Sequence, residues 1–272
     1  MSDLTASQRK AAAKEIIDAA QGKALPLTED ELESTTISFA CKEAQNTLRA
    51  ARESADSAMI FGSVINRTLK ISQGVALSGN WSTPAQDSLR AAVLFAGAGL
   101  DRALKVLVED TLHILSESDE VVREKFESFA QDAISRRGEN SVDPAALVDI
   151  LLSSGQHPRT ILVQRWKAHL SGASAQSVER VEEIATALGV TDSEIRKRVN
   201  PSAKGSALRA AFAARNKIAH ELDITKPKAD VRARLENIRA TRKADEVRKH
   251  VTEMLDTGRV IINDVSGRLD GE

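Results

Sequence analysis

Apolar residues recur at steps of three and four along most of the chain, the spacing that places them on one face of an α-helix. The longest such stripe follows Thr83 and runs through Leu89, Val93, Ala96, Leu100, Ala103, Leu104 and Leu107. The pattern predicts helices over roughly residues 3–20, 29–70, 84–116, 119–136, 144–153, 160–170, 176–188, 192–199, 205–222 and 242–266. Because no strand pattern of comparable strength appears, we predict an all-α fold.

Local signals mark several of these helices. Thr28-Glu-Asp-Glu31, Thr83-Pro-Ala-Gln86 and Thr191-Asp-Ser-Glu194 each have the form of a capping box, in which the Thr and the acidic or amide side chain satisfy amides of the first turn. Gly97 and Gly99 lower helix propensity inside the long apolar stripe, so we expect them to let a neighbouring helix approach closely.

Composition narrows the class of protein. The 272 residues include 14 Gly, six Pro, six Phe, two Trp and no Tyr, which disfavours a β-sandwich or barrel and the aromatic platforms of RNA-binding sheets. Cys41 is the only cysteine, which excludes an internal disulfide and a cysteine-based zinc site. We expect Cys41 to be an inert, packed thiol and Trp166 to be a core residue rather than a base-stacking surface.

The sequence also carries expectations about location and cofactors. No segment approaches the run of about 18 apolar residues that spans a bilayer, and the polar start lacks the apolar core of a signal peptide. We therefore expect a cytoplasmic protein that does not enter a membrane. The histidines show no metal-ligand spacing and no Gly-rich phosphate loop is present, so we expect no metal and no cofactor.

The segment SALRAAFAARNKIAHEL, residues 206–222, combines an apolar arc with unusual polar residues. On a helical wheel Arg215 falls inside the arc, where a charged group needs a partner. Asn216 and His220 are four residues apart and share a face, so the amide can orient the imidazole. Arg215, Asn216 and His220 thus meet at the edge of a surface that other residues are expected to cover.

These residues carry a family resemblance. Arg215-Asn216-Lys217-Ile218-Ala219-His220 resembles the R-x4-6-H motif of HEPN domains, and its helical surroundings resemble the RiboL-PSP-HEPN type. The resemblance spans roughly residues 85–265, although only the six-residue motif is specific. It implies a HEPN-like helical bundle over residues 81–272 with a helical insert at about 119–200, preceded by an N-terminal helical arm over residues 1–80. Leu222 stands where one HEPN subgroup has a Tyr.

The resemblance implies a metal-independent endoribonuclease that works as a homodimer, with 2',3'-cyclic phosphate and 5'-hydroxyl products. It assigns catalysis to Arg215 and His220, with Asn216 orienting the imidazole or binding phosphate. The implied setting is bacterial defence against phage or a toxin-like system, which would call for an inhibitor or antitoxin protein. His220 has the chemistry of a general base or acid, and Arg215 that of a phosphate clamp.

Charge is unevenly distributed along the chain. Residues 196–249 contain 16 Lys or Arg and six Asp or Glu, an excess of ten, so the rest of a chain with net charge -1 carries about minus eleven. Lys204, Arg209 and Lys217 lie nearest the motif and are the predicted RNA-binding residues, because non-specific RNA binding is largely electrostatic. A solvated helix face explains the same charges without a ligand.

Three alternatives remain open at this point. Arg215 can be a structural residue paired with Asp101 or Glu109, with His220 a helix-end residue. The domain can be a non-catalytic HEPN module that binds RNA or protein. Residues 181–199, VEEIATALGVTDSEIRKRV, also resemble a helix-turn-helix, which would make the protein a DNA-binding regulator.

Overall fold

The computed structural model describes residues 6–21, 37–134, 143, 148, 150, 152, 157–203, 205–227, 234 and 238–270. Over these residues the fold is all-α, as predicted, and β-type pairing amounts to an isolated bridge between Ile224 and Arg239. No helix in this part of the chain is both long enough and apolar enough to cross a membrane.

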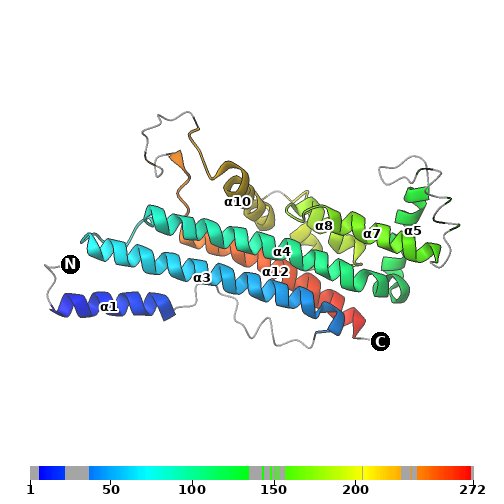
Figure 1. Ribbon diagram of the computed structural model, residues 1–272, viewed down its shortest axis with the longest axis horizontal. Coiled ribbons are helices and arrows are strands. Elements are labelled where there is room, and N and C mark those ends of the chain that lie inside the picture. The colour runs from blue at the N-terminus through cyan, green and yellow to red at the C-terminus, as the bar shows by residue number, and fades with distance from the viewer. Residues whose placement is uncertain are drawn as a thin grey trace. The chain divides into compact units, whose positions relative to one another are not determined.

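The helices follow the predicted order (Figure 1). Their bounds are α1 (Ala6–Gln21), the 3-10 turn η1 (Phe39–Cys41), α3 (Lys42–Ser72), α4 (Thr83–Ser118), α5 (Glu120–Ile134), α7 (Pro158–Gly172), α8 (Val178–Ala187), α9 (Ser193–Val199), α10 (Ala207–Glu221) and α12 (Ala244–Leu269). The helix predicted over 29–70 is wrong at its N-terminal end, because residues 37 and 38 are not helical and α3 begins at Lys42 after the 3-10 turn. The capping box at Thr28 lies outside the described residues. So does most of the helix predicted over 144–153.

The capping box predicted at Thr191 is wrong by one residue. Asp192 is the N-cap of α9, and its carboxylate accepts hydrogen bonds from the amides of Glu194 and Ile195 at 2.9 and 3.0 Å. An Asp in this position satisfies two orphan amides and places a negative charge at the positive end of the helix, which a Thr hydroxyl cannot do.

The chain divides into two compact units, and three long helices contribute segments to both. Unit 1 consists of Met1–Glu33, Arg49–Gly99 and Ala207–Asp256, and unit 2 of Ser34–Leu48, Leu100–Ser206 and Thr257–Glu272. The predicted boundary at residue 80 therefore falls inside unit 1, between helices that pack on each other.

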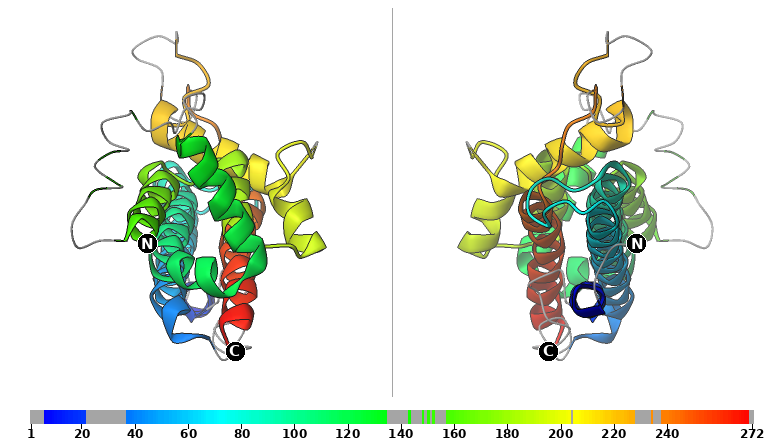
Figure 2. Two further views of the ribbon diagram at one scale, coloured as in Figure 1. Left: turned by 90° about the vertical axis from the view of Figure 1, so that its right-hand side faces the viewer. Right: turned by 90° about the vertical axis from the view of Figure 1, so that its left-hand side faces the viewer.

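In unit 1 the segments of α3 and α4 run antiparallel (Figure 1), and they pack closely at Gly99. A Cβ added to Gly99 would lie 2.0 Å from the Cβ of Ala51, so Gly99 permits the close approach that the sequence predicted. Helix α1, seen end-on in dark blue in Figure 2, is joined to α3 by an ion pair between Glu15 and Arg67.

Unit 2 packs α5, α7, α8 and α9 with the second half of α4 and the end of α12. Trp166 is 4% exposed, and its ring centroid lies 5.7 Å from that of Phe126 and 5.9 Å from that of Phe129, which confirms it as a core residue. Cys41 is fully buried, and burial raises the pKa of its thiol to about 12, so it is the packed, inert residue expected.

Candidate functional site

Helix α10 positions the motif, and its buried face is narrower than the predicted apolar arc. Its buried residues are Leu208, Ala211, Phe212, Ala214 and Ile218. In contrast, Ala207, Ala219 and Leu222, which the helical wheel of residues 206–222 also places on the apolar arc, are exposed, Leu222 by 63%. Leu222 leaves the arc because the helix ends at Glu221 and its own φ is +50°, which turns its side chain away from the helical path.

Arg215 is half-buried, and Gly97 of α4 makes the room for it. A Cβ added to Gly97 would lie 3.1 Å from Cγ and 3.7 Å from Nε of Arg215. The same Cβ would lie 3.7 Å from the sulfur of Met254 on α12. The aliphatic stem of Arg215 therefore packs on the backbone of α4, and this contact directs the guanidinium toward the end of α10.

The guanidinium brings the three motif residues together. Nη1 of Arg215 lies 3.1 Å from Oδ1 of Asn216 and 3.5 Å from Nε2 of His220. A guanidinium only donates hydrogen bonds, so this arrangement suits an imidazole whose Nε2 accepts. His220 is exposed and Asn216 is partly exposed, so a ligand can reach the group from solvent. The predicted cluster exists as a geometric unit at one end of the helix.

The other residues predicted for the site are the RNA-binding candidates Lys204, Arg209 and Lys217 and the supporting residue Asp101. Lys217 and Arg209 are exposed on α10, while Lys204 lies outside the described residues. Asp101, predicted as a partner of Arg215, accepts hydrogen bonds from the amide of Ala175 at 2.6 Å and from Lys105 at 3.2 Å.

Glu109 has an exposed side chain, and its backbone oxygen accepts a hydrogen bond from Lys167 at 2.5 Å. The contacts of Asp101 and of the Glu109 backbone are thus with residues of unit 2.

A buried ion cluster at the end of α10 was not foreseen from the sequence. Asp223 is 1% exposed and accepts from Nε of Arg90 at 3.1 Å and from Nε of Arg242 at 2.8 Å. Its backbone is also held, because its amide donates to the oxygen of Lys217 at 3.0 Å and its oxygen accepts from Ala240 at 2.8 Å. The cluster fixes the chain three residues after His220.

Two arginines keep the buried carboxylate of Asp223 ionised. Burial alone would raise the pKa of its carboxyl, but the hydrogen bonds and charge of Arg242, followed by those of Arg90, outweigh it and lower the pKa below its usual range. The partners are 133 and 19 residues away in sequence, so no local pattern could reveal them. Asp223 also has a positive φ of +62°, which the sequence does not signal because the residue is not a glycine.

The helix-turn-helix candidate has the predicted turn but a short second helix. Gly189 in the turn has φ +74°, and α9 is seven residues long. Nη1 of Arg196 donates to the hydroxyl of Thr186 on α8 at 2.6 Å, and Lys197 pairs with Glu194 at 2.7 Å. Two of the basic side chains of the short second helix, Arg196 and Lys197, are thus bonded within the motif.

Among the residues that the structure describes, no three His, Cys, Asp or Glu side chains gather as a metal site requires. Comparison with known proteins found no family model, no curated protein and no solved structure that matches the chain.

Proposed function

We propose that the protein is a metal-independent endoribonuclease whose active site contains Arg215 and His220. The observation that carries the proposal is the 3.5 Å approach of the Arg215 guanidinium to Nε2 of an exposed His220, with Asn216 at 3.1 Å on the same guanidinium. A phosphate clamp beside a proton acceptor is what cleavage at an RNA 2'-hydroxyl needs. The resemblance to HEPN domains supports the same assignment.

The proposed reaction is an internal transesterification. One histidine removes the proton of a 2'-hydroxyl, and the 2'-oxygen forms a bond to the adjacent phosphorus. The bond from phosphorus to the 5'-oxygen breaks, and a second histidine donates a proton to that oxygen. Arg215 stabilises the charge that accumulates on the phosphate oxygens. The products are a 2',3'-cyclic phosphate and a 5'-hydroxyl.

The need for two proton-transfer groups supports a homodimer. The motif supplies a single histidine, His220, whereas the reaction uses both a base and an acid. A two-fold axis at the end of α10 would bring two copies of the motif to one phosphate. The exposed position of His220 leaves it accessible to a partner chain. A cytoplasmic defence or toxin-like role with an inhibitor protein belongs to the same proposal.

The test is RNA cleavage in EDTA by the wild type and by His220→Ala and Arg215→Ala. His169→Ala is the matched histidine control, because His169 lies on α7 and pairs with Glu183. Arg123→Ala, an exposed residue of α5, is the matched arginine control. We expect each motif variant to lose at least about a hundredfold in rate, in keeping with the loss of a general base or a transition-state contact, and the controls to retain wild-type rates.

A mixed dimer tests the composite site. A dimer of one wild-type and one His220→Ala subunit should be nearly as slow as the variant homodimer, because it lacks either the base or the acid. Half of the wild-type rate in the mixed dimer would show that each subunit works alone. Equal rates in the wild type and the motif variants would remove the catalytic assignment, and RNA binding without cleavage would favour the non-catalytic module.

A further inference from the structure

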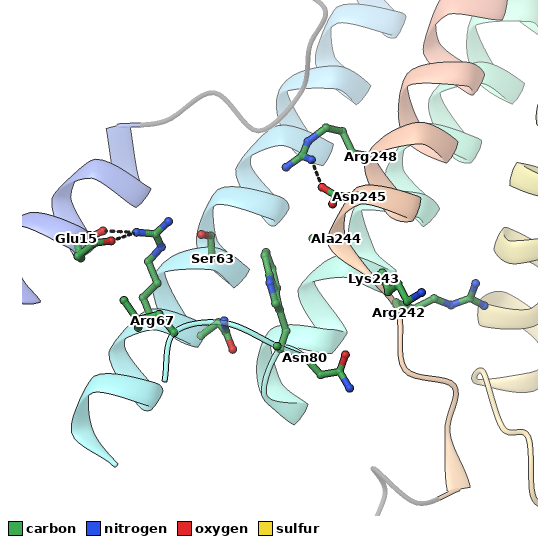
Figure 3. A pocket seen from close by; sticks show the side chains of 13 residues that line it. Glu15, Ser63, Arg67, Asn80, Arg242, Lys243, Ala244, Asp245 and Arg248 are labelled. Carbon is green, nitrogen blue, oxygen red and sulfur yellow. Dashed lines mark hydrogen bonds and ion pairs between the residues drawn. The ribbon is translucent and has the colours of Figure 1, made fainter. Parts of the chain in front are cut away.

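Two neighbouring cavities of unit 1 share the side chains of Trp81 and Asn80. The larger has a volume of about 510 Å³ and is lined from α1, α3, the loop before α4 and the start of α12 (Figure 3). The smaller, of about 270 Å³, is lined from the beginning of α4 and from residues 239–241. The larger volume is in the range of small-ligand sites. A partly exposed indole shared by two hollows can contact a ligand in either.

The cavity walls are basic. Six basic side chains line the two cavities: Arg67, Arg90, Arg239, Arg242, Lys243 and Arg248. The acidic side chains in the described walls are Glu15 and Asp245. Asp87, Asp223 and Glu246 lie next to the walls and pair with these cations, and counting them still leaves an excess of one positive charge. The balance favours an anionic ligand.

Ion pairs with carboxylates hold two of these arginines in position. Arg248 lies 2.6 Å from Asp245, and Arg67 pairs with Glu15; both pairs are drawn in Figure 3. Among the described residues Arg67 contacts Glu15 through Nη1, and since a guanidinium has five N–H donors, Arg67 keeps donors for phosphate oxygens. Lys243 has a side chain 72% exposed and only a 3.6 Å contact with Glu246, which makes it the most accessible cation of the wall.

The indole of Trp81 is held in place. A Cβ added to Gly62 would lie 2.8 Å from Cζ3 of Trp81, so the ring edge packs on the bare backbone of α3. The loop that carries Trp81 is fixed by Lys70, whose Nζ donates to the oxygens of Leu77 and Ser78 at 3.1 and 2.7 Å. A rigid aromatic ring beside basic groups is the combination that binds single-stranded nucleic acid.

Arg239 connects these cavities with the proposed active site. It lines the smaller cavity, and its Nε donates to the backbone oxygen of Leu222 at 2.9 Å. Leu222 follows His220 by two residues, about 7 Å of chain. The basic side chain of Arg239 thus lies between the proposed cleavage site at His220 and the cavities around Trp81.

We propose that the cavities around Trp81 bind one nucleotide of single-stranded RNA near the cleaved bond, with its base stacked on Trp81 and its phosphate against Arg239 and Lys243. The inference deepens the proposed ribonuclease function and rests on it for the identity of the ligand. It makes Trp81 and Lys243 binding residues that act on RNA affinity and not on the proton transfers at His220.

The experiment measures binding of a labelled 2'-O-methyl oligoribonucleotide to the full chain by fluorescence anisotropy. Methylation blocks the 2'-oxygen, so the strand binds without being cleaved. We expect Trp81→Leu to raise the Kd about tenfold, as loss of one base stack does, and Trp81→Phe to raise it less. Lys243→Gln should raise the Kd and lower the salt slope by about one. Lys249→Gln, an exposed residue of α12 outside both walls, is the matched control and should bind like the wild type.

The outcomes separate this inference from the ribonuclease proposal. Unchanged binding in both Trp81 variants overturns the inference, even if the wild type cleaves RNA. Binding that depends on Trp81 and Lys243 in a protein that does not cleave RNA supports the strand site and removes the catalytic proposal.

Two further ligands test whether the cavities bind RNA or a free nucleotide or phosphate. AMP and inorganic phosphate are titrated while tryptophan fluorescence is followed, since Trp166 is buried and Trp81 lines the cavities. We expect both to bind at least a hundredfold more weakly than the oligonucleotide. AMP binding as tight as that of the strand would identify a free-nucleotide site and overturn the RNA assignment. Binding of an acidic peptide in preference to RNA would do the same.

Discussion

Replacing Asp223 by Ala is expected to destabilise unit 1 strongly. The side chain is fully buried and bonds Arg90 and Arg242, whose side chains are 6% and 15% exposed. Removing one member of a buried ion pair leaves charges without a partner and costs about 3–5 kcal/mol. For a chain of this size, each kcal/mol lowers the Tm by about 2–4 °C, so the expected fall is about 6–20 °C.

Urea unfolding followed by circular dichroism measures this effect. Asp245→Ala is the control, because Asp245 pairs with Arg248 at 2.6 Å but has a side chain 85% exposed. A surface pair contributes about 0–1 kcal/mol, so the control should unfold at nearly the wild-type urea concentration. Equal losses in the two variants would refute the conclusion that the buried cluster anchors the end of α10.

The same anchor predicts a pH dependence. Because Arg242 and Arg90 hold the pKa of Asp223 below its unfolded value of about 3.9, the stabilisation is complete above that value. It is lost as the pH falls through about 3.9 toward the lower folded-state pKa. The unfolding free energy of the wild type should therefore fall more steeply below about pH 4 than that of Asp223→Ala. Parallel pH profiles for the two proteins would contradict the charged state assigned to Asp223.

Three further predictions concern packing. Gly99→Ala places a methyl 2.0 Å from the Cβ of Ala51, so we expect a loss of about 1–3 kcal/mol in urea unfolding, partly restored by adding Ala51→Gly. Gly97→Ala places a methyl 3.1 Å from Cγ of Arg215, so RNA cleavage should fall about tenfold while the Tm changes little. Cys41, with its pKa raised to about 12 by burial, should resist iodoacetamide at neutral pH and react only after unfolding, as mass spectrometry will show.

Helix positions were predictable because they depend on local periodicity and on glycine and proline placement. The apolar stripe after Thr83 lies on α4, as predicted. Gly97 and Gly99 of that helix are sites of close packing, against Arg215 and Ala51 respectively. Helix ends were less predictable, because they depend on single side-chain contacts. Asp192 caps α9 in place of Thr191 since its carboxylate reaches two amides.

The site was predictable only where its residues are close in sequence. Arg215, Asn216 and His220 lie within one and a half helical turns, so their meeting follows from helical geometry. Asp223 depends on Arg90 and Arg242, which are brought to it by tertiary folding. Trp81 sits between the helices predicted over residues 29–70 and 84–116, and its cavities are lined by four separate parts of the chain.

The central claim, that Arg215 and His220 cleave RNA without a metal, is tested most directly by the chemistry of the RNA ends formed in EDTA. The account predicts a 2',3'-cyclic phosphate on one fragment and a 5'-hydroxyl on the other with the wild type, and no cleavage above background with His220→Ala. Fragments with 5'-phosphate ends, or cyclic ends formed equally well by His220→Ala, would contradict it.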